Sequence, residues 1–332
     1  MPHGQRSSQV FPPLDHLHRS VLRKGSGAQK TPDAEEWVEF LDEAAIDWTV
    51  VYPTDGLAVG RITSEDAAVV VCRAYNDWLC EKFTRMSPRI KGVALLPLQY
   101  PDAAAEELNR VVTQLNFAAA MLPSNGEGLK AHLGAKMFWP VYEEAEKLGV
   151  ALAVHGGCHH HLGMDTFSTF YGVHALGHPL GIMIQAMAML SHGVFDRFPK
   201  LRVGYLEGGA AWVPFMMDRL DRSYHTHIQL DREGNQIVGP ESGEKASDYF
   251  RRHVREGRIF VGFDCDDETL GYAVTRTGPH PYPFASDFPH ESFDAASCKH
   301  EMEELLERSD ITTQDKEALL AANAKRFYGM DA

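Results

Sequence analysis

Short apolar runs and amphipathic stretches alternate along almost the whole of this 332-residue chain. The apolar runs, for example residues 47–53, 90–97 and 149–155, are rich in Val, Leu, Ile and Ala. Runs of this kind are typical of parallel strands that are covered on both faces. Between them, stretches such as 64–86 and 101–114 repeat apolar residues at helical spacing. The alternation predicts βαβ units and a parallel sheet.

The number of these runs indicates how the sheet closes. We expect strands at residues 10–18, 47–53, 90–97, 117–123, 149–155, 201–207, 258–263 and 283–287. We expect helices at 64–86, 101–114, 138–148, 179–194, 211–224, 244–254, 293–308 and 313–328. Eight of each predict an α/β fold made of a single (β/α)8 barrel of the TIM type over residues 1–332, with a doubly wound sheet as the alternative. No G-x-G-x-x-G or Walker A pattern supports nucleotide binding on an open sheet.

Composition excludes several kinds of partner. The net charge of -14 disfavours nucleic acid and anionic membranes, because both bind clustered Lys and Arg. No apolar run approaches the ~20 residues of a membrane span, and the first residues lack the apolar segment of a secretory signal. The five cysteines are few and mostly far apart, so we expect reduced thiols and a cytoplasmic protein. The polar segment 229–243 predicts a loop insertion between the sixth and seventh strands, either a lid or a subunit contact of a homodimer.

Four residues that commonly bind metals fall at or just past the ends of predicted strands. His16 and His18 form an H-x-H pair in the first strand, His155 ends the fifth and Asp287 ends the eighth. The two imidazoles of such a pair point to one face of a strand, and barrel enzymes keep their chemistry at strand ends. Each residue alone also fits a structural role, since the chain has 17 histidines. Together they predict one metal site, for Zn²⁺ first and Mn²⁺ second.

The chain resembles the amidohydrolase-related group that includes aminocarboxymuconate semialdehyde decarboxylase, also called the amidohydrolase-2 family, over nearly its whole length. The resemblance rests on His16-Leu17-His18, Val154-His155-Gly156, the passage 193–203, Ser286-Asp287-Phe288-Pro289 and the closing segment 323–328. It implies that His16, His18, His155 and Asp287 bind the metal. It also implies that Asp287 carries a proton.

Two positions depart from that family. The family usually has a catalytic histidine before two glycines at the end of the sixth strand, whereas this chain has Glu207 there. A carboxylate can orient or deprotonate water but cannot donate as an imidazolium does, so Glu207 favours hydrolysis. Leu14 stands where many relatives have an acidic residue. The fourth strand ends at 121–125 without a lysine to bridge two metals, which favours a single metal.

Further candidates surround these positions. His178 could supply the missing imidazole as a third catalytic residue beside Asp287 and Glu207. Candidate substrate contacts are Tyr52, Arg61, His174 and Trp212, with Arg61 suited to a carboxylate. The run His159-His160-His161 fits either a role in the site or a solvated loop.

These residues predict a metal-dependent hydrolase that acts on a small, cyclic or carboxylated organic molecule. Asp287 would accept a proton from metal-bound water, and Glu207 or His178 would orient that water or relay the proton. The alternative is a non-oxidative decarboxylase of a small aromatic or enoic acid. There the metal and Arg61 would hold the substrate, and Asp287 or His178 would protonate carbon. A non-catalytic metal-binding barrel is the third possibility, which an intact ligand set disfavours.

Overall fold

The computed structural model describes residues 32–157, 159–231, 239–290 and 294–330. The predicted first strand, with His16 and His18, lies outside these residues. Residues 232–238 of the predicted insertion also lie outside them. The metal-binding role of the two histidines therefore stays a prediction.

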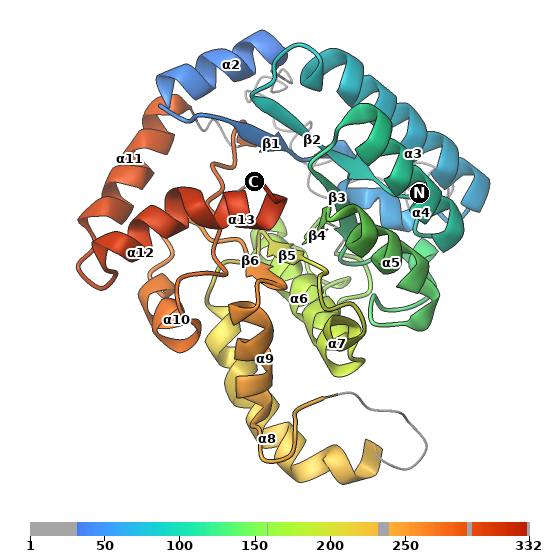
Figure 1. The fold of residues 1–332 in the computed structure, drawn as a ribbon, viewed down its shortest axis with the longest axis vertical. Coiled ribbons are helices and arrows are strands. Elements are labelled where there is room, and N and C mark those ends of the chain that lie inside the picture. Colours follow the sequence, from blue (N-terminus) through green and yellow to red (C-terminus); the bar gives the residue numbers. More distant parts are fainter. Residues whose placement is uncertain (1–31, 158, 232–238, 291–293, 331–332) are drawn as a thin grey trace.

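A parallel sheet of six strands forms the centre of the described chain (Figure 1). The strands are β1 (Thr49–Val51), β2 (Ile90–Leu95), β3 (Ala119–Pro123), β4 (Ala151–His155), β5 (Val203–Leu206) and β6 (Ile259–Val261), paired in chain order. Each lies within a predicted strand. The predicted strand at 283–287 is wrong among the described residues, because that segment makes one isolated parallel bridge, from Phe284 to Phe263, which lies beyond the end of β6. The parallel α/β architecture is confirmed, and closure by eight strands stays a prediction.

Helices cover the outside of this sheet (Figure 1). Their bounds are α2 (Ala34–Glu43), α3 (Glu65–Leu79), α4 (Pro101–Leu115), α5 (Trp139–Leu148), α6 (Phe170–Ser191), α7 (Val194–Arg197), α8 (Trp212–Asp231), α9 (Ala246–Arg255), α10 (Leu270–Thr277), α11 (Ala295–Glu307), α12 (Thr313–Glu317) and α13 (Asn323–Tyr328). Local sequence explains several ends. The Ser64 side chain caps α3, Pro101 occupies the first turn of α4, and Gly149 ends α5 with a positive φ of 65°.

The side chains on the two faces of the sheet pack in two separate hydrophobic clusters. In β4, Leu152 and Val154 pack with the layer of outer helices, whereas Ala151 and Ala153 pack in the inner cluster. Both faces are fully buried, as expected of a parallel sheet. The same alternation places His155 on the inner face, at the carboxyl end of the strand. The strand pattern thus carries this imidazole into the barrel interior.

The long helix α6 contradicts the expectation that no apolar run approaches the length of a membrane span. Residues Tyr171–Ser191 are long and apolar enough to cross a membrane, with a mean hydropathy of 1.3. Length and composition alone also fit a core helix, and α6 contacts β4 and β5 as a helix of the barrel does. Its start at Phe170 also precedes the predicted start at Pro179, which lies inside the helix.

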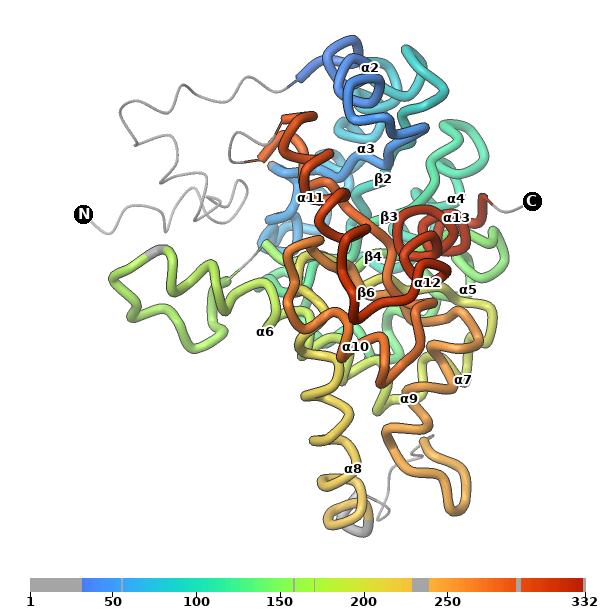
Figure 2. The backbone as a smooth tube through the Cα atoms, turned by 90° about the vertical axis from the view of Figure 1, so that its left-hand side faces the viewer, coloured from blue at the N-terminus to red at the C-terminus, as the bar shows by residue number. Residues whose placement is uncertain are grey.

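The predicted insertion spans the connection between α8 and α9. Residues 229–231 are the end of α8, and residues 239–243 lead towards α9. The two helices extend away from the strands (Figure 2). Asp221 joins them by accepting hydrogen bonds from the backbone N–H and the hydroxyl of Ser247, both at 2.8 Å. A lid or subunit contact at 229–243, and the homodimer, stay predictions.

Candidate active site

His155 is a buried polar residue at the carboxyl end of β4. Its side chain is 4% exposed, and its Nε2 atom lies 3.2 Å from Oε1 of Glu207. Its other ring nitrogen, Nδ1, lies 2.8 Å from the carbonyl oxygen of Gly156. Burial lowers the pKa of His155, but the Glu207 carboxylate outweighs burial and leaves that pKa raised.

Glu207 directly follows β5, where Leu206 pairs with His155 across the sheet. Its φ of 61° is unusual for a residue with a side chain. Burial would raise the pKa of Glu207, but the imidazoles of His155 and His178 lower it to about 2. The carboxylate is therefore ionised at neutral pH. The sequence-based expectation that Glu207 faces the same site as His155 agrees with this geometry.

His178 reaches the same carboxylate from α6. Its Nε2 atom lies 3.4 Å from Oε2 of Glu207, and its ring packs directly on Gly156. A Cβ atom at Gly156 would lie 2.0 Å from Cδ2 of His178, so only glycine fits there. Burial and the neighbouring histidines lower the pKa of His178 to about 3. The imidazole is therefore neutral at pH 7 and can donate one hydrogen bond to Glu207.

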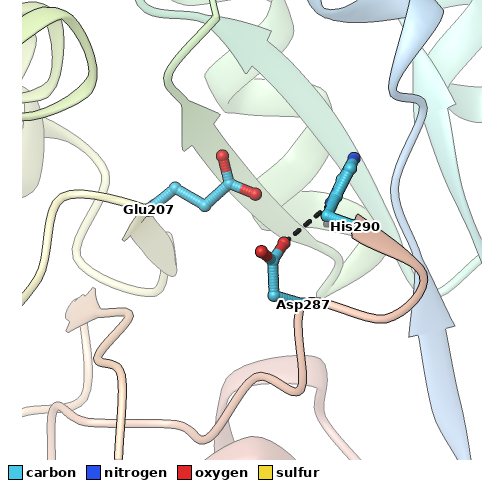
Figure 3. Close-up of side chains that lie close together, drawn as sticks. All are labelled: Glu207, Asp287 and His290. Carbon is cyan, nitrogen blue, oxygen red and sulfur yellow. Dashed lines mark hydrogen bonds and ion pairs between the residues drawn. The ribbon is translucent and has the colours of Figure 1, made fainter. Parts of the chain in front are cut away.

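Asp287 approaches Glu207 from the segment after β6 (Figure 3). One side-chain atom each from Glu207, Asp287 and His290 lies within 4.8 Å of the others, which is close enough to hold one metal ion. His290 Nδ1 lies 2.8 Å from Oδ1 of Asp287, and His290 Nε2 lies 3.3 Å from Oγ1 of Thr54. Burial and neighbouring acidic groups raise the pKa of Asp264 to about 6. These carboxylates form an acidic centre that suits a cation.

The predicted substrate-binding residues differ in how close they lie to His155 and Glu207. The Tyr52 ring lies 5.5 Å from the His155 ring, and its hydroxyl lies 2.9 Å from that of Tyr328. His174 is exposed, with its ring 5.1 Å from that of His178. Trp212 is buried, and its Nε1 has no hydrogen-bond partner among the described residues. Tyr52 and His174 therefore border the centre, whereas Trp212 lies beneath it.

Arg61 is also buried, but it is already occupied by other side chains. Its Nε atom lies 3.1 Å from Oε2 of Glu127, and its Nη1 atom lies 2.8 Å from Nε2 of His160. This arrangement links the segment after β1 to the segment after β4. A substrate carboxylate would have to share Arg61 with these partners.

The three consecutive histidines have separate surroundings. The His159 ring is buried 4.8 Å from that of His178 and packs on Gly177. His160 contacts Arg61, whereas the His161 side chain is 73% exposed. The solvated-loop interpretation therefore describes only the last of the three.

Sequence reasoning missed His290. The available signal was its position three residues after Asp287, in the same tail beyond a strand-like run. Its hydrogen bond to Thr54 joins positions 236 residues apart, and no local pattern predicts that.

Comparisons with known proteins agree with this architecture. A family model described as "Amidohydrolase" matches residues 16–330. The 2-amino-3-carboxymuconate-6-semialdehyde decarboxylase of Dictyostelium discoideum is 25% identical over 300 residues, covering 90% of this chain and 77% of the relative. The gamma-resorcylate decarboxylase of Rhizobium sp. (strain MTP-10005) is 27% identical over 310 residues, covering 89% and 86%.

Solved structures show the same fold. A 2,6-dihydroxybenzoate decarboxylase complexed with 2,6-dihydroxybenzoate matches with a TM-score of 0.71 at 22% identity, covering 98% of this chain and 96% of the other. A dihydroxybenzoic acid decarboxylase from Polaromonas sp. JS666, with bound manganese and 2-nitroresorcinol, matches with a TM-score of 0.69 at 21% identity, covering 98% and 93%.

These findings correct the functional prediction. The Dictyostelium and Rhizobium relatives, which match 90% and 89% of the chain, are both decarboxylases, so the prediction of a hydrolase is wrong and its alternative is favoured. The prediction of hydrolysis rested on Glu207, which stands where the family usually has a histidine. The Polaromonas structure contains manganese, and for this chain both the metal and the order of Zn²⁺ and Mn²⁺ stay predictions.

Proposed function

The chain belongs to the amidohydrolase family, and we propose that it is a metal-dependent, non-oxidative decarboxylase of a small aromatic acid. The observation that carries this proposal is the meeting of His155, Glu207 and Asp287 at the carboxyl ends of the strands. Decarboxylase relatives that cover 89–90% of the chain support the choice of reaction.

The residues of this centre fit a divalent cation. His155 has its Nδ1 hydrogen directed at a carbonyl, so its Nε2 lone pair is free to bind metal, and the carboxylate of Asp287 lies nearby. We propose His155 and Asp287 as ligands, joined by His16 and His18 from the segment outside the described residues. When bound, the metal would anchor the substrate through its oxygen atoms and offset their negative charge.

The side chains then have to move one proton. Decarboxylation adds a proton to the ring carbon and breaks its bond to the carboxylate, which leaves as CO₂, so no oxidant is required. We propose Asp287 as the donor, because its carboxyl group lies in the cluster with Glu207, whereas the neutral His178 already directs its ring hydrogen at Glu207. Tyr52 would pack against the aromatic ring of the substrate beside His155.

A carbon dioxide assay tests the proposal. The metal-loaded protein is offered a panel of hydroxylated benzoic acids and enoic acids, and CO₂ is measured. We expect release from at least one aromatic acid, loss of release after chelation, and recovery with Mn²⁺ or Zn²⁺. The His155→Ala variant should release none. Absence of CO₂ from the whole panel in a protein with stoichiometric metal would overturn the proposal.

A further inference from the structure

Glu207 and His155 face each other in a way that requires a positive charge between them. The carbonyl of Gly156 can only accept a hydrogen bond, so the nearby Nδ1 of His155 carries the ring hydrogen. In a neutral imidazole Nε2 is then an acceptor, and it faces the acceptor Oε1 of Glu207 at 3.2 Å. Either a proton or a metal ion must lie between these two atoms.

The separation of the two atoms suits a shared metal. Imidazole nitrogens and carboxylate oxygens bind divalent ions at about 2.0–2.2 Å, so two ligands at ordinary bond angles lie roughly 2.8–3.6 Å apart. The observed 3.2 Å falls in that range. From the other side, a carboxylate oxygen of Asp287 lies within 4.8 Å of one from Glu207 (Figure 3). A cation between the two carboxyl groups would remove the repulsion that they exert on each other when both are charged.

We propose that Glu207 is itself a metal ligand, through Oε1, together with His155 and Asp287. This inference rests on the proposed function and deepens it, because it assigns a role to the residue at which this chain departs from its relatives. His178 has the role of a positioning residue. Its Nε2 lies 3.4 Å from Oε2, which fixes the carboxylate and leaves Oε1 directed at the metal.

The assignment changes what the site prefers. A second carboxylate makes the ligand set harder, which favours Mn²⁺ over Zn²⁺ in comparison with three imidazoles and one carboxylate. It also removes Glu207 from proton transfer. Asp287 is then the residue that protonates carbon.

Metal binding by the full-length protein tests this role without reference to turnover. Chelated protein is titrated with Mn²⁺, and the free ion is followed by electron paramagnetic resonance. We expect Glu207→Gln to raise the Kd for Mn²⁺ by about 100-fold or more, since it removes a direct ligand. Glu304→Gln is the matched control, because it makes the same carboxylate-to-amide change at a side chain of α11 that is 54% exposed. It should change the Kd by no more than about threefold.

A ligand-restoring variant keeps the test decisive if Glu207→Gln folds poorly. Glu207→His supplies a nitrogen ligand, so it should bind metal more tightly than Glu207→Gln and favour Zn²⁺ over Mn²⁺ relative to the original protein. Circular dichroism of the chelated proteins reports folding. Mn²⁺ affinity in Glu207→Gln equal to that of Glu304→Gln would overturn the assignment. So would an unchanged metal preference in Glu207→His.

The outcomes also separate this inference from the proposed function. If Glu207→Gln weakens Mn²⁺ binding but the protein never releases CO₂, Glu207 is a metal ligand and the proposed decarboxylase activity is refuted. If the protein releases CO₂ but its Mn²⁺ affinity does not depend on Glu207, the decarboxylase activity stands and the proposal that Glu207 is a metal ligand is refuted.

Discussion

The Nδ1 atom of His290 lies 2.8 Å from Oδ1 of Asp287, and Thr54 approaches the other nitrogen of the same ring at 3.3 Å. The Asp287 carboxylate can only accept, so His290 donates to it and accepts from the Thr54 hydroxyl. This chain of bonds fixes one oxygen of the proposed ligand Asp287. Groups that orient a metal ligand in this way contribute to metal affinity.

We therefore expect His290→Ala to weaken metal binding about 10- to 100-fold, with a smaller loss in Thr54→Val. The measurement is the Kd for Mn²⁺ in chelated protein. His300→Ala is a suitable control, since that side chain is 71% exposed on α11. Equal affinity in His290→Ala and His300→Ala would show that His290 has no positioning role.

Gly156 is sterically constrained by His178. An added Cβ would lie 2.0 Å from the ring, so we expect Gly156→Ala to displace His178 and cost about 1–3 kcal/mol of unfolding free energy. Gly172→Ala is the control, because its Cβ would meet its nearest atom at 3.3 Å. Denaturant unfolding of both variants gives the comparison. A Gly156→Ala protein as stable as Gly172→Ala would contradict the tight packing.

Arg61 and Glu127 form a pair whose two variants distinguish substrate binding from support of the loop. If Arg61 contacts the substrate carboxylate, Arg61→Met should raise KM at least about tenfold. Glu127→Gln should then leave KM unchanged or lower it, because it frees the guanidinium. If Arg61 only holds the segments after β3 and β4 through Glu127 and His160, both variants should lower activity together. Steady-state kinetics on an identified substrate decides.

The fully buried His253 makes stability depend on pH. Burial and the charges of Arg258 and Arg252 lower its pKa to about 3. The unfolded chain binds the proton first, so stability is present above pH ~6.5 and falls by about 1.4 kcal/mol per pH unit below it. Unfolding free energies at pH 7, 6 and 5 measure this slope. The slope should be shallower in His253→Gln, and an identical slope would contradict the assignment.

The sequence allowed prediction of the features that depend on local patterns. The apolar run 149–155 and the strand β4 end at the same residue, His155. The position of His155 at a strand end could therefore be predicted from the local pattern of apolar residues. The prediction of a strand at 283–287 was wrong, because only Phe284 pairs with a neighbouring segment. Asp287 has a φ of 53°, which is incompatible with an extended strand at the end of that run. Pro179 suggested a helix start, yet the chain was already helical from Phe170.

Long-range partners lay beyond sequence reasoning. Arg61 could be identified as a charged residue after a strand, but its ion pair with Glu127 bridges 66 positions. The same holds for Glu207, whose chemistry depends on His155 and His178 from other elements. Its residue type alone suggested the wrong reaction.

The most direct test of the central claim is the fate of carbon and hydrogen in a reaction run in D₂O. For a substrate found in the CO₂ assay, the account predicts one CO₂ per turnover and one deuterium on the ring carbon that carried the carboxylate. Mass spectrometry of the product reads both. A product that lacks deuterium at that carbon, or that contains an oxygen atom from labelled water, would contradict the account.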